Sequence, residues 1–328
     1  MIKFGVRLPN SGSFAYAENV KHLALLAEEL GFHSVWVHDH IIWGTTQASM
    51  HPTIGTTARS ININFFESVT TLAYLAGMCE TVNLGIAAII LPLRNPVILA
   101  KQLANIDVMS NSRLLLGVVP GAPSLTIPEF EAVNTNYHER GRITDEYIEV
   151  LRAIWSQHPV SFEGNYIKLK DAEILPKPSK GTIPIIIGGG EKGLSARALK
   201  RVAERGDGWL PAYLTPEEIR LGLKTIEELW RQNQRSTKPL IIHENYVFMA
   251  DSQQQVVDIC EKLFNATFNG VEEGIKRNLV GKTSAIISKI EEYAKAGVDI
   301  IELKFTSNSF DHILNMVKRF SEEVIPSF

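Results

Sequence analysis

Short apolar runs alternate with amphipathic stretches along the chain. The runs are rich in Val, Ile and Leu and nearly continuous, as in parallel strands covered on both faces, whereas ENVKHLALLAEEL repeats its apolar residues with a helical period. This alternation predicts an α/β fold with one parallel sheet and crossover helices. The predicted strands are Lys3–Leu8, Ser34–Asp39, Val82–Ile89, Leu114–Val118, Ile183–Ile187, Asp207–Leu210, Ile241–Phe248 and Asp299–Phe305.

The number of strands decides between two α/β architectures. Eight strand–helix units, joined by crossovers that are right-handed in parallel sheets, favour a closed (β/α)8 TIM barrel over an open doubly wound sheet. The 328 residues show no linker, so we expect a single domain over residues 1–328. Insertions are expected after strands two, four and seven, at 41–65, 120–137 and 265–282, and a hairpin within 159–180.

Composition narrows the class of protein. Hydrophobic residues make up 45% of the chain, mean hydropathy is +0.01 and the net charge is −3. These values argue against a basic surface that binds nucleic acid or an anionic membrane. No apolar run reaches transmembrane length and no signal peptide precedes the first strand, so we expect a cytoplasmic protein. Cys79 and Cys260, the only cysteines, are too far apart in sequence for a CxxC redox pair.

The second predicted strand ends in VWVHDH, which places His38, Asp39 and His40 at the carboxyl end of the barrel. One interpretation is a metal-binding His-x-His pair. That site needs further ligands, but strands five and six end in IIIGGG and GDGWLP without His, and strand eight ends in LKFTSN without Asp. We therefore expect no metal. A neutral imidazole also suits proton transfer at neutral pH, and a histidine that caps a strand end is the plainer alternative.

Small residues interrupt the third strand. In VNLGIAAIILPLRNP, Ala87 and Ala88 stand where a barrel interior usually has Val or Ile. Either a ligand occupies the space beside them, or the strand packs closely against a helix. The two readings stay open from spacing alone.

Three glycines open a helix after the fifth strand. The backbone N–H groups of Gly188, Gly189, Gly190, Glu191 and Lys192 can converge on a phosphate at the positive end of the helix dipole. The alternative is a tight strand-to-helix turn, and barrels more often bind phosphate after strands seven and eight.

Taken in order, these segments resemble the bacterial luciferase-like family, whose (β/α)8 barrels bind a flavin or a deazaflavin. The resemblance covers nearly the whole chain and is carried by FGVRLPN, EELGFHSVWVHDH, the third strand, DVMSNSRLLLGV, RGRITDEYIEVLRAIW, the glycine segment with ERGDGWLP, and GVDIIELKF. Each segment alone is ordinary for a β/α protein. Their order is what makes the resemblance specific.

The resemblance implies a role for several residues. Ala87 and Ala88 are expected to form a non-prolyl cis peptide beneath the flavin ring, and His40 is expected to face the reactive edge of the ring as the catalytic group. Asp39 with His40 is similar to the Asp-His of deazaflavin-dependent members, so Asp39 is counted with the cofactor-binding residues. Gly188 to Lys192 match the phosphate loop. Candidate substrate-contacting residues are Leu8, Pro9, Trp43 and Ile90, with Trp36 as a further candidate for this apolar wall.

The chain departs from the family at one place. Pro120 stands where luciferases have an arginine for the flavin phosphate, and Gly121 with Ala122 replaces the usual Gly-Trp. The phosphate charge then needs another partner, such as Lys192.

The resemblance implies an enzyme, a flavin-dependent monooxygenase that uses reduced FMN on a small organic substrate. One alternative is a dehydrogenase or reductase that depends on the deazaflavin coenzyme F-420, and another is a non-catalytic flavin-binding barrel. The implied partners are a flavin reductase and a second copy of the chain in a homodimer. The helix FESVTTLAYLAGM at 66–78 is apolar enough for that interface, or for packing against the barrel.

Overall fold

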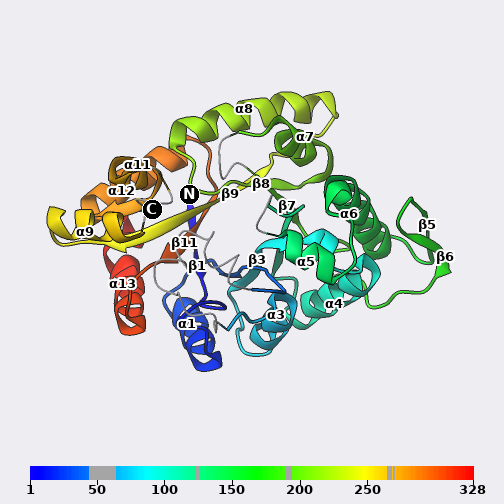
Figure 1. Ribbon diagram of the computed structural model, residues 1–328, viewed down its shortest axis with the longest axis horizontal. Coiled ribbons are helices and arrows are strands. Elements are labelled where there is room, and N and C mark those ends of the chain that lie inside the picture. The colour runs from blue at the N-terminus through cyan, green and yellow to red at the C-terminus, as the bar shows by residue number, and fades with distance from the viewer. Residues whose placement is uncertain (44–63, 123–125, 190–193, 264–267, 269) are drawn as a thin grey trace.

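The computed structural model describes residues 1–43, 64–122, 126–189, 194–263, 268 and 270–328. Eight parallel strands form a closed barrel surrounded by helices, which confirms the predicted fold (Figure 1). Around the barrel the strands are β1 (Lys3–Arg7), β2 (Ser34–Val37), β3 (Asn83–Ile90), β4 (Leu114–Val119), β7 (Ile185–Gly188), β8 (Gly208–Leu210), β9 (Leu240–Met249) and β11 (Ile300–Phe305). Pairing of β11 with β1 closes the ring.

The helices lie outside the strands (Figure 1), and each buries one apolar face against them. They are α1 (Ala17–Glu29), α3 (Ser68–Ala76), α4 (Pro96–Met109), α6 (Arg140–Ser156), α7 (Ala196–Arg205), α8 (Pro216–Gln232), α12 (Thr283–Lys295) and α13 (Phe310–Glu323). The start of α8 shows why they begin where they do. Thr215 and Glu218 form a capping box, and Pro216 occupies the first turn, where its missing N–H costs nothing.

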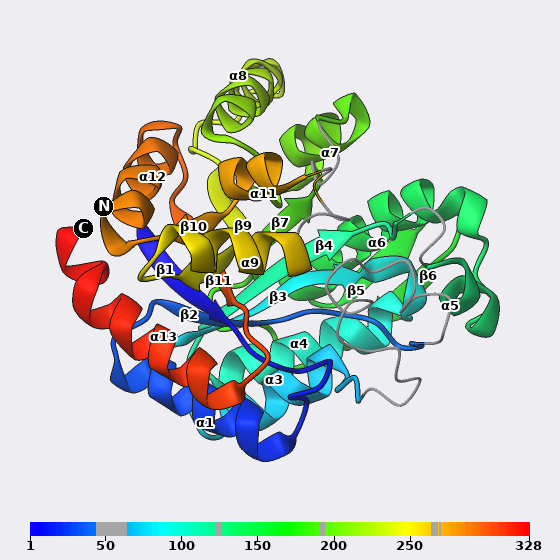
Figure 2. The same cartoon turned by 60° about the vertical axis from the view of Figure 1, so that its left-hand side comes forward.

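The expected insertion 265–282 contains a strand that the sequence did not predict, and the segment inserted after β9 begins earlier, with a helix. Most of 41–65 lies outside the described residues; 120–137 carries α5 (Ile127–Ala132), and the hairpin is β5 (Val160–Glu163) with β6 (Lys168–Ala172). After β9 come α9 (Gln253–Leu263), α11 (Val271–Arg277) and the extra strand β10 (Leu279–Gly281) (Figure 2). Because β8 is short, the last residues of β9 have an open edge, and β10 pairs there.

Apolar side chains fill the amino-terminal half of the barrel interior. Trp36 of β2 points inward and is fully buried against the backbone of Gly5 and Gly85 on the flanking strands. A Cβ atom at Gly85 would lie 2.1 Å from Trp36 Cε3. The rest of the cluster is Ala87, Ile186, Leu210, Ile242 and Ile300. Trp36, a candidate for the apolar wall, is therefore a core residue.

We predict that Gly85→Ala destabilises the protein by about 3 kcal/mol, because the indole of Trp36 has no room to move away from the new methyl group. Gly77→Ala is the matched control. A Cβ at Gly77 meets nothing nearer than 3.7 Å, so its effect should stay within about 0.5 kcal/mol. Urea unfolding measures both, and equal stability of the two variants would contradict the tight packing around Trp36.

Candidate active site

Charged side chains form the next layer of the barrel interior. Arg7 on β1, Glu244 on β9 and Glu302 on β11 each lie two positions after an inward-facing residue, so they point inward one layer closer to the carboxyl ends. Arg7 Nε donates to Glu302 Oε1, and Arg7 Nη2 lies 3.0 Å from Glu244 Oε2. The side chain of Glu302 is fully buried, and that of Arg7 is 6% exposed. The apolar cluster thus ends at a buried ion cluster.

The charges of this cluster depend on one another. Burial alone lowers the pKa of Arg7, but Glu244 and Glu302 outweigh it and raise the pKa, so the guanidinium stays charged. Burial raises the pKa of Glu302 against the opposing effect of Arg7, and the negative charge of Glu244 adds to the rise. Two carboxylates share one guanidinium here, so a proton on Glu302 makes the cluster neutral.

His38, Asp39 and His40 follow β2 on alternate sides. The strand ends at Val37, before the predicted end at Asp39, because the backbone N–H and C=O of His38 bond to the side chain of Asn10 rather than to a neighbouring strand. The two histidines lie toward the barrel interior, where His38 Nδ1 is 2.9 Å from Arg7 Nη1. Asp39 faces the other way.

Asp39 holds together the carboxyl ends of two strands. Its fully buried carboxylate accepts two hydrogen bonds from Arg94, at 2.6 and 2.7 Å, one from Ser68 Oγ and one from the backbone N–H of Ile90. Asp39 therefore fixes the end of β3 and has no contact with the ring of His40. A contact of Asp39 with the cofactor stays a prediction.

His40 is oriented by a buried carboxylate on another element. His40 Nδ1 lies 2.8 Å from Glu129 Oε2, and Glu129, on α5, also accepts the backbone N–H groups of Ile41 and Ile42. The glutamate is fully buried and the imidazole is 13% exposed. An ionised carboxylate can only accept, so the hydrogen of the neutral ring is on Nδ1. No described residue bonds to Nε2, which is the atom available for chemistry.

Aromatic side chains surround this imidazole. Trp43 and Phe65 contact His40 edge to face, with ring centroids 5.1 and 5.5 Å away. Among the other candidate substrate-contacting residues, Leu8 belongs to the main hydrophobic core, and Ile90 packs in a smaller cluster with Leu93 and Phe130. Pro9 is half-buried. Trp43 is thus the candidate that the structure places directly against His40.

The regular pairing of β3 is interrupted at Ala87 and Ala88. The Ala87–Ala88 peptide is cis, as the resemblance implies, and the pairing of β3 with β4 shifts register between Ile86 and Ile89. Between residues 84 and 90, Ala88 is the one position that is not buried. Arg7 Nη2 donates to the carbonyl of Ala87 at 3.3 Å, so the ion cluster lies directly against this segment.

The glycine segment lies at the carboxyl end of β7, two strands further around the barrel. Gly188 ends the strand, and the carbonyl of Gly189 accepts a hydrogen bond from Trp209 Nε1 at 2.8 Å. A Cβ atom at Gly189 would lie 2.6 Å from the Cβ of Ala198 on α7. Gly190, Glu191 and Lys192 lie outside the described residues.

Tyrosines and a lysine line the barrel mouth across from His40. Tyr213 stacks on Tyr246, with centroids 4.9 Å apart, and donates to Glu244 at 2.5 Å, while Lys304 Nζ donates to the hydroxyl of Tyr246. Burial and the charge of Glu244 raise the pKa of Tyr213, which keeps its hydroxyl a donor.

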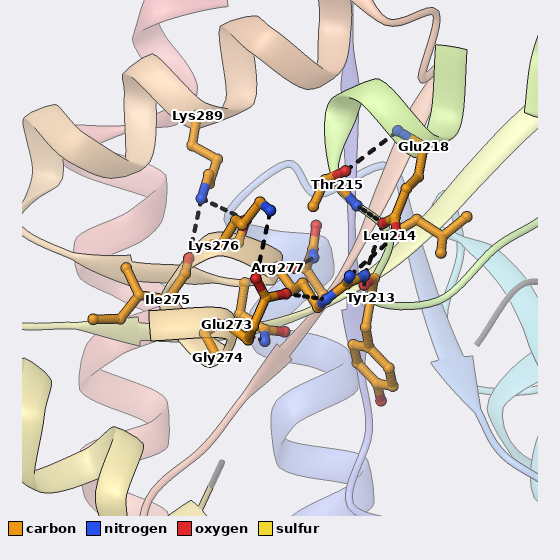
Figure 3. A network of polar contacts seen from close by, with 12 residues as sticks. Tyr213, Leu214, Thr215, Glu218, Glu273, Gly274, Ile275, Lys276, Arg277 and Lys289 are labelled. Atoms are coloured by element: carbon orange, nitrogen blue, oxygen red, sulfur yellow. Dashed lines mark hydrogen bonds and ion pairs between the residues drawn. The ribbon is translucent and has the colours of Figure 1, made fainter. Parts of the chain in front are cut away.

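Contacts from the insertion after β9 fix the segment that carries Tyr213. Arg277 of α11 donates to both carboxylate oxygens of Glu218, at 2.7 and 3.1 Å, and to the carbonyl of Tyr213 at 3.1 Å (Figure 3). The backbone N–H of Leu214 in the same segment donates to His243 Nε2. The insertion is therefore a structural support of the barrel mouth.

In the part of the chain that the structure describes, no three His, Cys, Asp or Glu side chains are placed to hold a metal ion, and no helix is long and apolar enough to cross a membrane. A sequence profile described as luciferase-like monooxygenase matches residues 2–300. The chain belongs to the luciferase-like monooxygenase family. That family contains flavin-dependent monooxygenases and oxidoreductases.

Relatives of this luciferase-like protein use different cofactors. The FMNH2-dependent dimethylsulfone monooxygenase of Pseudomonas putida is 27% identical over 301 residues, which cover 80% of this chain and 78% of that enzyme. A monooxygenase from Streptomyces bottropensis has the same fold, with a TM-score of 0.78, 21% identity and 99% of each chain covered. So does a coenzyme F-420-dependent secondary alcohol dehydrogenase solved with an F-420–acetone adduct, with a TM-score of 0.80, 20% identity and 100% and 99% coverage.

Sequence reasoning missed several polar residues of this luciferase-like site, and four of them show why. Arg7, Glu244 and Glu302 do leave a signal, because each is a charge inside a continuous apolar strand, in FGVRLP, IIHENYVF and IIELKF. Glu129 leaves none. It reaches His40 from an insertion 89 positions away, and no periodic pattern reports such a contact.

We predict that His243 makes the protein less stable in mild acid. Burial lowers its pKa from 6.5 to about 3, so the folded state keeps the ring neutral while the unfolded chain takes up a proton below pH 6.5. Stability is therefore fully present above pH 6.5 and falls as the pH drops toward 3.

The measurement is urea unfolding at pH 7 and pH 5 of the wild type and His243→Gln. The glutamine keeps an acceptor for Leu214, and the wild type should lose up to about 2 kcal/mol more between the two pH values than the variant. His33→Gln is the comparison, because burial lowers the pKa of His33 to about 4 as well. An equal loss in the wild type and His243→Gln would contradict the assignment.

Proposed function

We propose that this protein is a flavin-dependent monooxygenase that acts with reduced FMN on a small organic substrate. The observation that carries the proposal is the pair of His40 and Glu129 at the barrel mouth, with Nε2 of the histidine unbonded among the described residues. A flavin, when bound, supplies the redox chemistry. The protein would supply orientation, a site protected from water and one group for proton transfer.

The residues fit a flat ring at the carboxyl end of β3. The strand presents small side chains there, Ala88 is partly exposed within a buried strand, and Arg7 holds the Ala87 carbonyl from below. A ring above Ala88 would have His40 beside it, with Nε2 able to accept a proton from a reacting group or to donate one when protonated. Trp43 would contact the substrate at the same edge.

A second candidate is a coenzyme F-420-dependent dehydrogenase or reductase. Its support is the similar fold of the F-420-dependent alcohol dehydrogenase and the pair Asp39–His40. The dimethylsulfone monooxygenase of Pseudomonas putida, a relative with FMNH2 in its name, favours FMN. A non-catalytic flavin-binding barrel is the third candidate, and the buried glutamate that orients His40 argues against it.

Titration of the purified protein with FMN and with F-420, followed by visible absorbance, tests the cofactor. We expect saturable FMN binding that is tighter than F-420 binding. Tighter binding of F-420 would select the second candidate. Binding of neither would overturn the proposed function.

We predict that His40→Asn lowers turnover by a factor on the order of 10², with flavin affinity little changed, because one positioned acid or base contributes about that much. Single-turnover kinetics with prereduced flavin isolate the chemical step. His22→Asn, an exposed histidine on α1, is the control and should react at the wild-type rate. A His40 variant that reacts normally would leave this residue only a binding role.

The cofactor phosphate is proposed to lie at Gly188 to Lys192. A bulky residue at Gly189 cannot test this cleanly, because its Cβ would collide with Ala198. The double variant Gly189→Ala with Ala198→Gly removes that collision. The φ of Gly189 is 157°, which strains any side chain, so binding of riboflavin, which has no phosphate, is the check that the site is intact. We expect riboflavin binding as in the wild type, while FMN affinity falls about tenfold. Unchanged FMN affinity would place the phosphate elsewhere.

Three further expectations concern the surroundings of the protein. A monooxygenase of this kind needs a flavin reductase to supply reduced cofactor. A homodimer would cover the exposed apolar side chains on α3 and α4, Tyr74, Ile98 and Met109, and the mass from light scattering checks it. A cytoplasmic location stays a prediction.

A further inference from the structure

The two histidines of the His38-Asp39-His40 segment have partners of opposite charge, a guanidinium for one and a carboxylate for the other. Both rings contact Phe65, at centroid distances of 4.9 Å for His38 and 5.5 Å for His40. His40 Nδ1 faces the carboxylate of Glu129, whereas His38 Nδ1 faces the guanidinium of Arg7. The partner decides which ring nitrogen carries the hydrogen of the neutral imidazole.

The contact with Arg7 leaves His38 one arrangement. A guanidinium has donors and no acceptor, so at 2.9 Å Arg7 Nη1 donates and His38 Nδ1 accepts. The hydrogen of the neutral ring is then on Nε2. His38 Nε2 lies 2.5 Å from the hydroxyl oxygen of Ser11, so the imidazole donates and Ser11 accepts.

This arrangement sets the direction of the Ser11 hydroxyl. A serine hydroxyl has one hydrogen, and Ser11 Oγ uses a lone pair to accept from His38, so its own hydrogen has to point elsewhere. No described residue accepts it. Ser11 is half-buried at the carboxyl end of the barrel, where its backbone bridges to Phe65, the ring between the two histidines.

We propose that Ser11 is a ligand-binding residue whose hydroxyl donates a hydrogen bond to an acceptor oxygen of the molecule bound at the barrel mouth, with Arg7 and His38 fixing its direction. This inference rests on the proposed function. Ser11 selects a ligand that carries a carbonyl or sulfone-type oxygen as the hydrogen-bond acceptor. The oxygen belongs either to the pyrimidine ring of the flavin or to the substrate. His38 and Arg7 are positioning residues in this arrangement.

The hydrogen positions are tested first, in the ligand-free protein at pH 7.5. Nitrogen-15 NMR of labelled histidines distinguishes the two neutral tautomers, and His38→Asn and His40→Asn assign the signals. We expect His38 with its hydrogen on Nε2 and His40 with its hydrogen on Nδ1. A His38 hydrogen on Nδ1 would overturn the proposal whatever the protein binds.

The donation to a ligand is tested with Ser11→Ala, Ser11→Thr as the conservative variant, and Ser156→Ala, an exposed serine on α6, as the control. If the acceptor is on the flavin, the dissociation constant of FMN rises about three- to tenfold in Ser11→Ala and returns toward the wild-type value in Ser11→Thr. If the acceptor is on the substrate, Ser11→Ala binds FMN with unchanged affinity. The dimethylsulfone concentration that gives a half-maximal absorbance response of bound FMN then rises about three- to tenfold in this variant.

The outcomes distinguish failure of the Ser11 role from failure of the proposed function. If the wild type and Ser11→Ala bind FMN equally well and respond equally to dimethylsulfone, the role of Ser11 is overturned and the proposed function still stands. A wild type that binds neither FMN nor F-420 would overturn both. An equal loss in Ser156→Ala would show that the effect is not specific to Ser11, and would also count against the proposal.

Discussion

A guanidinium excluded from water has to find all its hydrogen-bond partners within the protein, and Arg7 finds them on four other strands or their ends. Its nitrogens contact Glu302 on β11, Glu244 on β9, His38 after β2 and the carbonyl of Ala87 on β3. Loss of any partner would leave a charge or a polar group unpaired in the interior. The side chain of Arg7 therefore fixes the positions of five strands relative to one another along the barrel axis.

The layers of the barrel place the polar side chains of the candidate site above Arg7. Below it, Trp36 packs with aliphatic neighbours, and its indole N–H donates to the hydroxyl of the buried Ser34. Above it, the inward positions carry histidine, tyrosine and lysine, and each is held by a partner outside the barrel wall or across it. Glu129 and Arg277 come from insertions, so the loops that vary most in barrel proteins here fix the groups at the mouth.

The sequence predicted the elements well because strand and helix periods are local properties. The alternation of apolar runs placed all eight barrel strands, and the alanines of the third strand and the His38–His40 segment marked two parts of the site. The pairing of Arg7 with Glu302 joins residues 295 positions apart and depends on closure of the ring, which no local pattern encodes. The contact of Glu129 with His40 depends on the path of an insertion, and β10 on the length mismatch of two strands.

The indole of Trp36 also has a kinetic consequence. Because it and its neighbours fill the interior from the amino-terminal side, no molecule reaches the layer above Arg7 through that end of the barrel. If the cofactor and the substrate of the proposed function stack above this layer, the one that lies deeper has to enter first and leave last. Compulsory-order binding, with the deeper molecule first, would then follow from the packing of one tryptophan between two glycines.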